Sequence, residues 1–106
     1  MVDVPVTDRL ELLIRRHEEE LRKLAGEASL CAVSRAGKAV PAIKYQEGST
    51  AVLRELRRRV ESGSDWESAT DEVRQRLIGQ ASLAARSTDW FAYVEGGSDA
   101  LAELGV

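Results

Sequence analysis

The sequence predicts an all-α fold, and the observations that predict it are three stretches of apolar residues at helical spacing. Residues 8–36, 49–61 and 64–86 each repeat apolar side chains every three or four positions. The opposite positions are mostly charged or polar, as on helices that pack one face on a core. We therefore expect one domain spanning residues 1–106, in which a long N-terminal helix packs with two further helices and a short C-terminal helical cap.

The first predicted helix carries an apolar seam in which intervals of four and three alternate, the pattern of a helix that packs along its length. The seam consists of Leu10, Ile14, His17, Leu21, Leu24, Ala28 and Cys31. Thr7 and Asp8 are typical of a helix start, so residues 1–7 are expected to form a flexible N-terminal tail. Gly37, followed by Pro41, predicts the end of this helix.

Acidic and basic residues four positions apart line the other side of this helix, as in Glu11–Arg15 and Glu18–Arg22. The acid comes first in each pair, which is the favourable order along a helix. These pairs predict a solvated outer face.

One part of the first helix has a second interpretation. Residues 28–33 are apolar on every side, so the helix could end at Gly26 and a β-hairpin could occupy residues 29–45. Pro41 would confine its strand to a sheet edge. The continuing seam favours the helix, and the alternative fold class is α+β.

The second predicted helix has four residues on its apolar face and Gly63 at its end. The four are Val52, Leu53, Leu56 and Val60. An earlier start at Pro41 is the alternative, with Gly48 as an irregularity inside the helix.

The third predicted helix begins with Ser64 and Glu67, whose spacing is that of a capping box. Its inward side is formed by Trp66, Ala69, Val73, Leu77, Ala81 and Ala84. A short segment over residues 88–94 follows, then a turn at Gly96-Gly97, then a last helical turn or two over residues 99–104.

The overall composition excludes several classes of protein. The net charge of −3 creates no field that would draw the chain to nucleic acid or to an anionic membrane. No apolar stretch approaches the ~18–20 residues of a membrane span, and the N-terminal residues lack the pattern of a secretory signal. A single cysteine allows no intrachain disulfide, so we expect a cytoplasmic location.

Catalysis has little support in the sequence. His17 is the only histidine, and Cys31 lies fourteen residues further along the same predicted helix. At ~1.5 Å per residue the two would be about 21 Å apart, too far for a catalytic dyad. One histidine and one cysteine also lack the paired spacing of a zinc site, so no metal or cofactor is expected. His17 is instead expected to form a polar layer that fixes the register of helix packing.

The aromatic residues form the most informative cluster. Trp90, Phe91 and Tyr93 lie within four residues, so their helical turn cannot hide all three on one face. They either plug an end of the bundle or bind a partner, for which tryptophan and tyrosine are common anchors. Trp66, which continues the apolar face of its helix, is expected to be a core residue, whereas Trp90 is expected to serve association.

Two further sets of residues allow weaker interpretations. Arg54, Arg57, Arg58 and Arg59 form a basic run that is either a solvated helix face or a nucleic-acid-binding surface. Lys44, Tyr45 and Glu47 either line a small polar cleft or belong to an ordinary join between helices.

A continuous first helix predicts self-association. At ~1.5 Å per residue a helix over residues 8–36 would be about 43 Å long, which exceeds the reach of a compact domain of this size. We therefore expect a homodimer through this helix, with an interface formed by Leu10, Ile14, His17 and Leu21.

The function expected from the sequence is a non-catalytic protein–protein interaction or regulatory module that acts through helix-mediated association, with an unidentified protein partner. The alternative is a small regulator that binds a ligand or nucleic acid through the basic run Arg54–Arg59.

Overall fold

The protein folds as a bundle of helices. The computed structural model describes the backbone of residues 3–84 and 88–105, and the side chains of residues 6–26, 42–82 and 90–105. Its helices are α1 (Asp3–Glu61), α2 (Trp66–Ala84) and α3 (Thr88–Glu103). The described backbone contains no strand, so the all-α prediction is confirmed and the β-hairpin over residues 29–45 is wrong.

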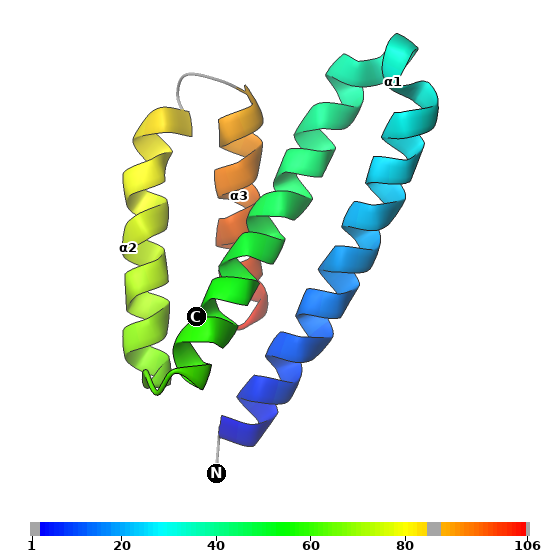
Figure 1. The fold of residues 1–106 in the computed structure, drawn as a ribbon. Coiled ribbons are helices and arrows are strands. Elements are labelled where there is room, and N and C mark those ends of the chain that lie inside the picture. The colour runs from blue at the N-terminus through cyan, green and yellow to red at the C-terminus, as the bar shows by residue number, and fades with distance from the viewer. Residues whose placement is uncertain (1–2, 85–87, 106) are drawn as a thin grey trace.

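Helix α1 doubles back on itself to form two antiparallel arms (Figure 1). The ring nitrogen Nδ1 of His17 lies 2.7 Å from Oε1 of Gln46, although a straight helix would hold these residues about 44 Å apart. Likewise, Nε of Arg54 donates to Oε2 of Glu18 over 3.0 Å. The chain therefore reverses between residues 26 and 42. We refer to residues 3–26 as the N-terminal arm and to residues 42–61 as the C-terminal arm.

These two arms correct the predicted bounds of the first two helices. The helix begins at Asp3, so residues 3–7, expected to precede it, belong to the helix. Pro5 is compatible with this start, because the first turn of a helix has no acceptor for the amide hydrogen that proline lacks. The second predicted helix is the C-terminal arm, in its longer version that includes Gly48. The predicted seam positions Ala28 and Cys31 lie outside the described side chains.

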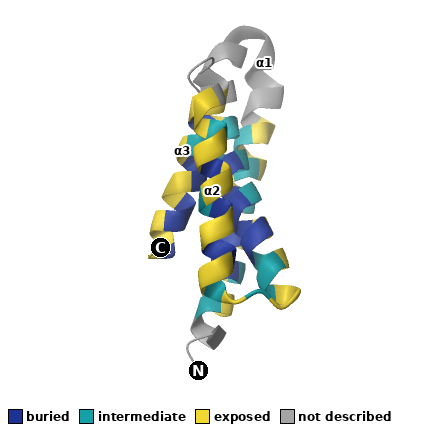
Figure 2. Ribbon diagram, turned by 90° about the vertical axis from the view of Figure 1, so that its left-hand side faces the viewer, coloured by how far each residue is buried: buried dark blue, intermediate teal, exposed yellow. Residues whose placement is uncertain are grey.

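The core lies between the two arms of α1 and the pair formed by α2 and α3 (Figure 2). Its buried apolar residues come from all three helices: Leu10, Leu13, Ile14, Val52, Leu53, Leu56, Ala69, Val73, Leu77, Ala100, Leu101 and Leu104. The molecule measures 50 × 29 × 21 Å, so the folded-back α1 sets its length.

The seam of the first predicted helix is covered by the chain itself. Leu10 and Ile14 are among the most deeply buried side chains, and His17 is buried too. The homodimer was predicted because these residues would overhang a compact domain. The reversal of α1 removes that reason, since the C-terminal arm and α3 occupy the surface that a second copy was expected to cover.

Close packing of α3 against the C-terminal arm depends on glycine. A Cβ atom on Gly48 would overlap the carbonyl group of Tyr93, and one on Gly96 would overlap the carbonyl group of Tyr45. The hydroxyl of the buried Ser49 donates to the carbonyl oxygen of Gly96 over 2.9 Å. The two backbones therefore approach to a distance that any larger residue at Gly48 or Gly96 would prevent.

The continuous course of α3 corrects the prediction for residues 88–104. Gly96-Gly97 was expected to form a turn before a separate helical cap over residues 99–104, but α3 runs through both glycines without a break. A Cβ atom on Gly97 would lie 2.9 Å from side-chain carbons of Leu77 and Val52. Glycine is needed here for close packing, not for a turn.

The connection between α1 and α2 follows its local sequence closely. The amide of Gly63 donates to the carbonyl of Val60, and that of Ser64 donates to the carbonyl of Arg59. With a φ of 105° at Gly63, this is a Schellman ending of the helix, as the glycine predicts. The cap of α2 is Asp65 and not the predicted Ser64, because Oδ1 of Asp65 accepts the amide of Ser68 over 2.7 Å.

Candidate interaction surface

Large apolar side chains are exposed mainly on α2 and α3. Among the described residues the exposed ones are Leu12 at 62%, Ile78 at 60%, Phe91 at 57% and Trp90 at 42%. Leu12 lies on the N-terminal arm among charged neighbours, and single exposed leucines of this kind are ordinary. Ile78, Phe91 and Trp90 belong to the two adjacent helices α2 and α3.

An open groove of about 320 Å³ runs between α2 and α3. Most of its lining is apolar: Leu77, Ile78 and Ala81 from α2, and Val94, Leu101 and Ala102 from α3. Arg74 and Ser98 add the polar groups. Ala81, Ser98 and Ala102 are the small residues of this lining, and Ile78 is its most exposed large apolar residue.

The exposed residues of α2 and α3 can be grouped by the side of the helix on which they lie. On α3, Phe91, Glu95, Ser98 and Ala102 are exposed and lie four, three and four positions apart, which places them on one side of the helix. On α2, the same spacing places Arg74, Ile78 and Ala81 on one side. We call these seven residues the α2–α3 face.

The predicted partner-binding residues do not behave alike. Phe91 belongs to the α2–α3 face, and Trp90 beside it is partly exposed. The rings of Trp90 and Tyr93 meet edge to face, with centroids 5.4 Å apart. Tyr93 is half-buried, and its backbone carbonyl packs against Gly48. The aromatic cluster is therefore divided: Tyr93 supports the bundle, while Trp90 and Phe91 reach solvent.

Two opposite charges lie on the α2–α3 face. The guanidinium of Arg74 lines the groove, and its ion pair with Asp71 is long, at 3.9 Å. Glu95 is exposed and forms no ion pair with the described part of the chain. Both charged groups are accessible to a partner.

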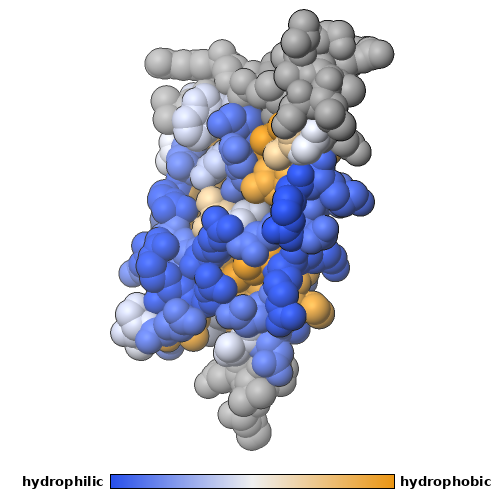
Figure 3. All heavy atoms as spheres, turned by 45° about the vertical axis from the view of Figure 1, so that its right-hand side comes forward, coloured by the Kyte–Doolittle hydropathy of each residue, from blue (hydrophilic) through white to orange (hydrophobic). Residues whose placement is uncertain are grey.

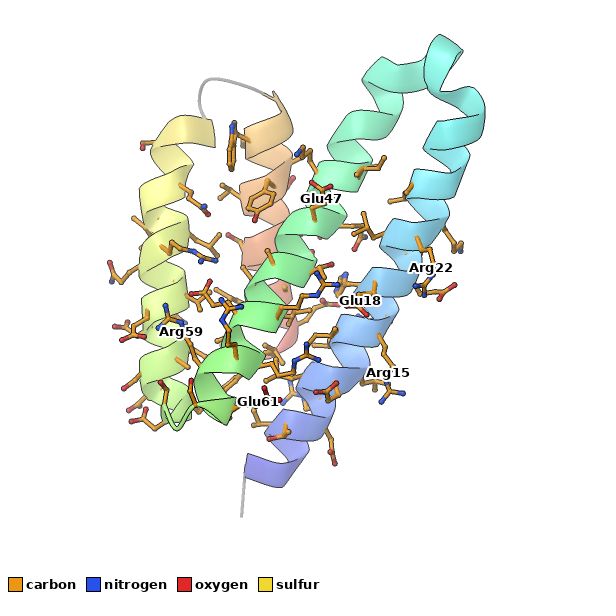
Figure 4. The ribbon with its side chains drawn as sticks, in the orientation of Figure 1. Arg15, Glu18, Arg22, Glu47, Arg59 and Glu61 are labelled. Carbon is orange, nitrogen blue, oxygen red and sulfur yellow. The ribbon has the colours of Figure 1, made fainter. Side chains whose placement is uncertain are left out.

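The basic run is largely neutralised within the bundle. Arg54 pairs with Glu18, Arg57 with Glu11, and Arg59 with both Glu55 and Glu72. Figure 4 shows Glu18 directed toward the C-terminal arm, whereas Arg15 and Arg22 lie on the outer side of the N-terminal arm. Arg58 makes no ion pair with the described residues.

Charged groups dominate the surface around the two arms of α1. Hydrophilic residues cover most of the view in Figure 3, with only small apolar patches between them. Many of these charges are already paired across helices, which favours a solvated face over a nucleic-acid surface for Arg54, Arg57 and Arg59.

His17 forms the polar layer that its place in the seam predicts. It is 9% exposed, and its Nε2 lies 2.8 Å from Oε1 of Glu103, at the end of α3. Gln46 contacts the other ring nitrogen from the C-terminal arm, and Arg16 holds the second carboxylate oxygen of Glu103. The histidine therefore joins three segments of the bundle, and no described nucleophile lies within this network.

The residues considered for a polar cleft form structural contacts. The hydroxyl of Tyr45 donates to Oδ2 of Asp99 on α3 over 2.5 Å. Asp99 and burial together raise the pKa of Tyr45 to about 12. Lys44 and Glu47 form an ion pair with each other along the helix, over 3.1 Å.

Metal binding and membrane insertion find no support in the described residues. His, Cys, Asp and Glu side chains do not gather there in groups of three that could hold a metal ion. Likewise, none of the described helices is both long and apolar enough to cross a bilayer. Comparison of the chain with family models, curated proteins and solved structures finds no match.

Proposed function

We propose that this protein is a non-catalytic interaction module that associates with a partner through the α2–α3 face and the adjoining Trp90. The observation that carries this proposal is the joint exposure of Ile78, Phe91 and Trp90 on two adjacent helices. Exposed apolar surface costs free energy in water, and exposed large apolar residues beside a groove are typical of protein-binding surfaces.

The chemistry of the face supports a protein as the partner. Trp90 and Phe91 provide large apolar area with few rotatable bonds, which makes such residues effective anchors. The groove between α2 and α3 provides a complementary hollow for side chains of the partner. The few polar groups on this face, Arg74, Glu95 and Ser98, would orient the partner.

A comparison of three variants tests this function. The double variant Trp90→Ala/Phe91→Ala removes the exposed aromatics, and Leu12→Ala removes an equally exposed apolar residue from another face. Trp66→Ala is the reference for lost packing, because Trp66 packs against the core. We expect Trp66→Ala to lower the free energy of unfolding by roughly 2–4 kcal/mol, and the aromatic double variant by less than about 1 kcal/mol.

The binding measurement is cross-linking in an extract of the native host, followed by mass spectrometry of the captured proteins. Wild type and Leu12→Ala should capture the same set, and the aromatic double variant should lose part of it. Identical capture by all three folded proteins would contradict the proposed surface. A melting temperature of the double variant as low as that of Trp66→Ala would instead make the aromatics a core plug.

A further inference from the structure

We infer that the partner on the α2–α3 face is a second copy of this chain, with Arg74 of each copy paired to Glu95 of the other. This inference rests on the proposed function, because it uses the same face. It replaces the predicted interface along the N-terminal arm, where Leu10, Ile14 and His17 are already buried.

The charges on the face support a second copy. Among the described residues, Arg74 is the only charged side chain that lines the groove. Glu95 lies on the neighbouring helix at helical spacing from Phe91 and Ser98, near enough to Tyr45 to help raise the pKa of that phenol, and makes no ion pair with the described residues. In a two-fold symmetric dimer each copy presents the same surface, so an Arg74 that meets Glu95 of the other copy forms this pair twice. The long contact with Asp71, at 3.9 Å, leaves Arg74 available for a closer carboxylate.

The apolar part of the face is self-complementary in the same way. Ile78 and Phe91 are 60% and 57% exposed, and the lining of the groove includes the small side chains of Ala81, Ser98 and Ala102. Each copy therefore supplies both projecting side chains and a hollow of about 320 Å³ that can receive those of its partner. A symmetric interface requires this combination on a single surface, because the same patch meets itself.

The test is the dissociation constant of the dimer, measured by sedimentation equilibrium from low to high micromolar concentration. The variants are Arg74→Glu, Glu95→Arg and the exchanged double variant Arg74→Glu/Glu95→Arg. Each single reversal places like charges across the two-fold axis, and we expect it to weaken the dimer by about tenfold or more. The double variant restores opposite charges and should bring the dissociation constant back toward that of the wild type.

The apolar contribution has a matched control. Ile78→Asp should abolish the dimer, whereas Leu12→Asp should leave it unchanged, because the two residues are almost equally exposed on different faces. Circular dichroism melts of all variants confirm that the monomers are folded. The charge reversals change only exposed or half-exposed positions, so they also report on the interface if an apolar variant fails to fold.

Several results would overturn this inference. They are a monomer at every concentration, no recovery in the exchanged double variant, and equal effects of Ile78→Asp and Leu12→Asp. The proposed function fails separately, when the aromatic double variant still captures every protein that the wild type captures from host extract. A monomeric chain whose captured proteins depend on Trp90 and Phe91 would retain the function with a different partner.

Discussion

At the scale of single residues, the start of α2 shows how narrowly a local prediction can miss. The sequence places a hydroxyl and an acid side by side, and both Ser64 and Asp65 are good caps. In the structure the cap is Asp65, whose carboxylate accepts hydrogen bonds from the amide and the hydroxyl of Ser68. These bonds hold the pKa of Asp65 below its usual range, the bond to the backbone amide contributing most.

We expect Asp65→Ala to lower the melting temperature by several degrees, because it leaves the first amides of α2 without an acceptor. Ser64→Ala should change it little. Asp65→Asn, which keeps a capping oxygen but not the charge, should retain most of the stability at neutral pH. Thermal melts of the three variants test whether Asp65 is the cap. A larger loss of melting temperature in Ser64→Ala than in Asp65→Ala would show that Ser64 is the cap instead.

Tyr45 provides a prediction about pH. Its pKa is raised to about 12 from an ordinary value of 10.0, chiefly by the hydrogen bond that its hydroxyl donates to Asp99. A raised pKa means that the fold favours the protonated phenol. The stabilisation is therefore complete below about pH 10 and is lost as the pH rises toward 12. Asp99→Asn should lower the pKa of Tyr45, because it removes the carboxylate charge.

The measurement is the phenolate absorbance of the folded protein across this range, with Tyr45→Phe as the reference that isolates the signal of Tyr45. Urea unfolding at each pH should show the wild type losing stability relative to Tyr45→Phe as the solution becomes alkaline. An unchanged titration of Tyr45 in Asp99→Asn would show that the hydrogen bond is absent in solution.

At the scale of helices, the apolar spacing predicted which residues face the core, but not where the chain reverses. Leu10, Ile14 and Val52 are buried as expected. The bounds of the first helix were wrong because its apolar spacing continues into the reversal, and a local pattern does not record a long-range contact. Glu18 illustrates this limit: Arg22 is four positions away, but Glu18 pairs with Arg54 on the opposite arm.

The exposed surface was predicted only in part, for the same reason. Trp90 and Phe91 stand out in the sequence because they are rare aromatics in a short segment. Ile78, by contrast, is an ordinary apolar residue of a helix, and only the arrangement of α2 beside α3 shows that it is exposed. The role of Gly96 was predicted wrongly for the same reason. Gly96-Gly97 is typical of a turn in the sequence, but α3 runs through both glycines.

The close packing of α3 against the C-terminal arm can be tested by adding a methyl group at Gly48 or Gly96. Gly48→Ala and Gly96→Ala should each destabilise the protein by roughly 2 kcal/mol or more, because the added methyl group overlaps backbone that cannot move alone. Gly79→Ala is the control, since its Cβ would meet nothing within 4 Å. We expect it to stabilise α2 by up to about 1 kcal/mol through helix propensity.

Urea unfolding of the three alanine variants measures these differences. If Gly48→Ala and Gly96→Ala were as stable as Gly79→Ala, the two helices would not approach as closely as the structure shows.

At the scale of the whole molecule, the fold depends on the reversal of α1 (Figure 1). The reversal buries the apolar seam and places Glu18 opposite Arg54. A chain in which α1 extended straight would expose the seam of the N-terminal arm and require a second copy to cover it.

The most direct test is the distance between spin labels at Arg15 and Arg58, one on each arm, measured by pulsed electron paramagnetic resonance. Arg15→Cys and Arg58→Cys, at two exposed positions, provide the attachment sites. Cys31 is replaced by serine so that labels attach only at these positions. Excess unlabelled protein restricts the signal to distances within one chain. Packed arms with axes about 8–10 Å apart predict a label distance of roughly 20–35 Å. A distance near 65 Å, which a straight helix of ~1.5 Å per residue would give, would contradict the reversal.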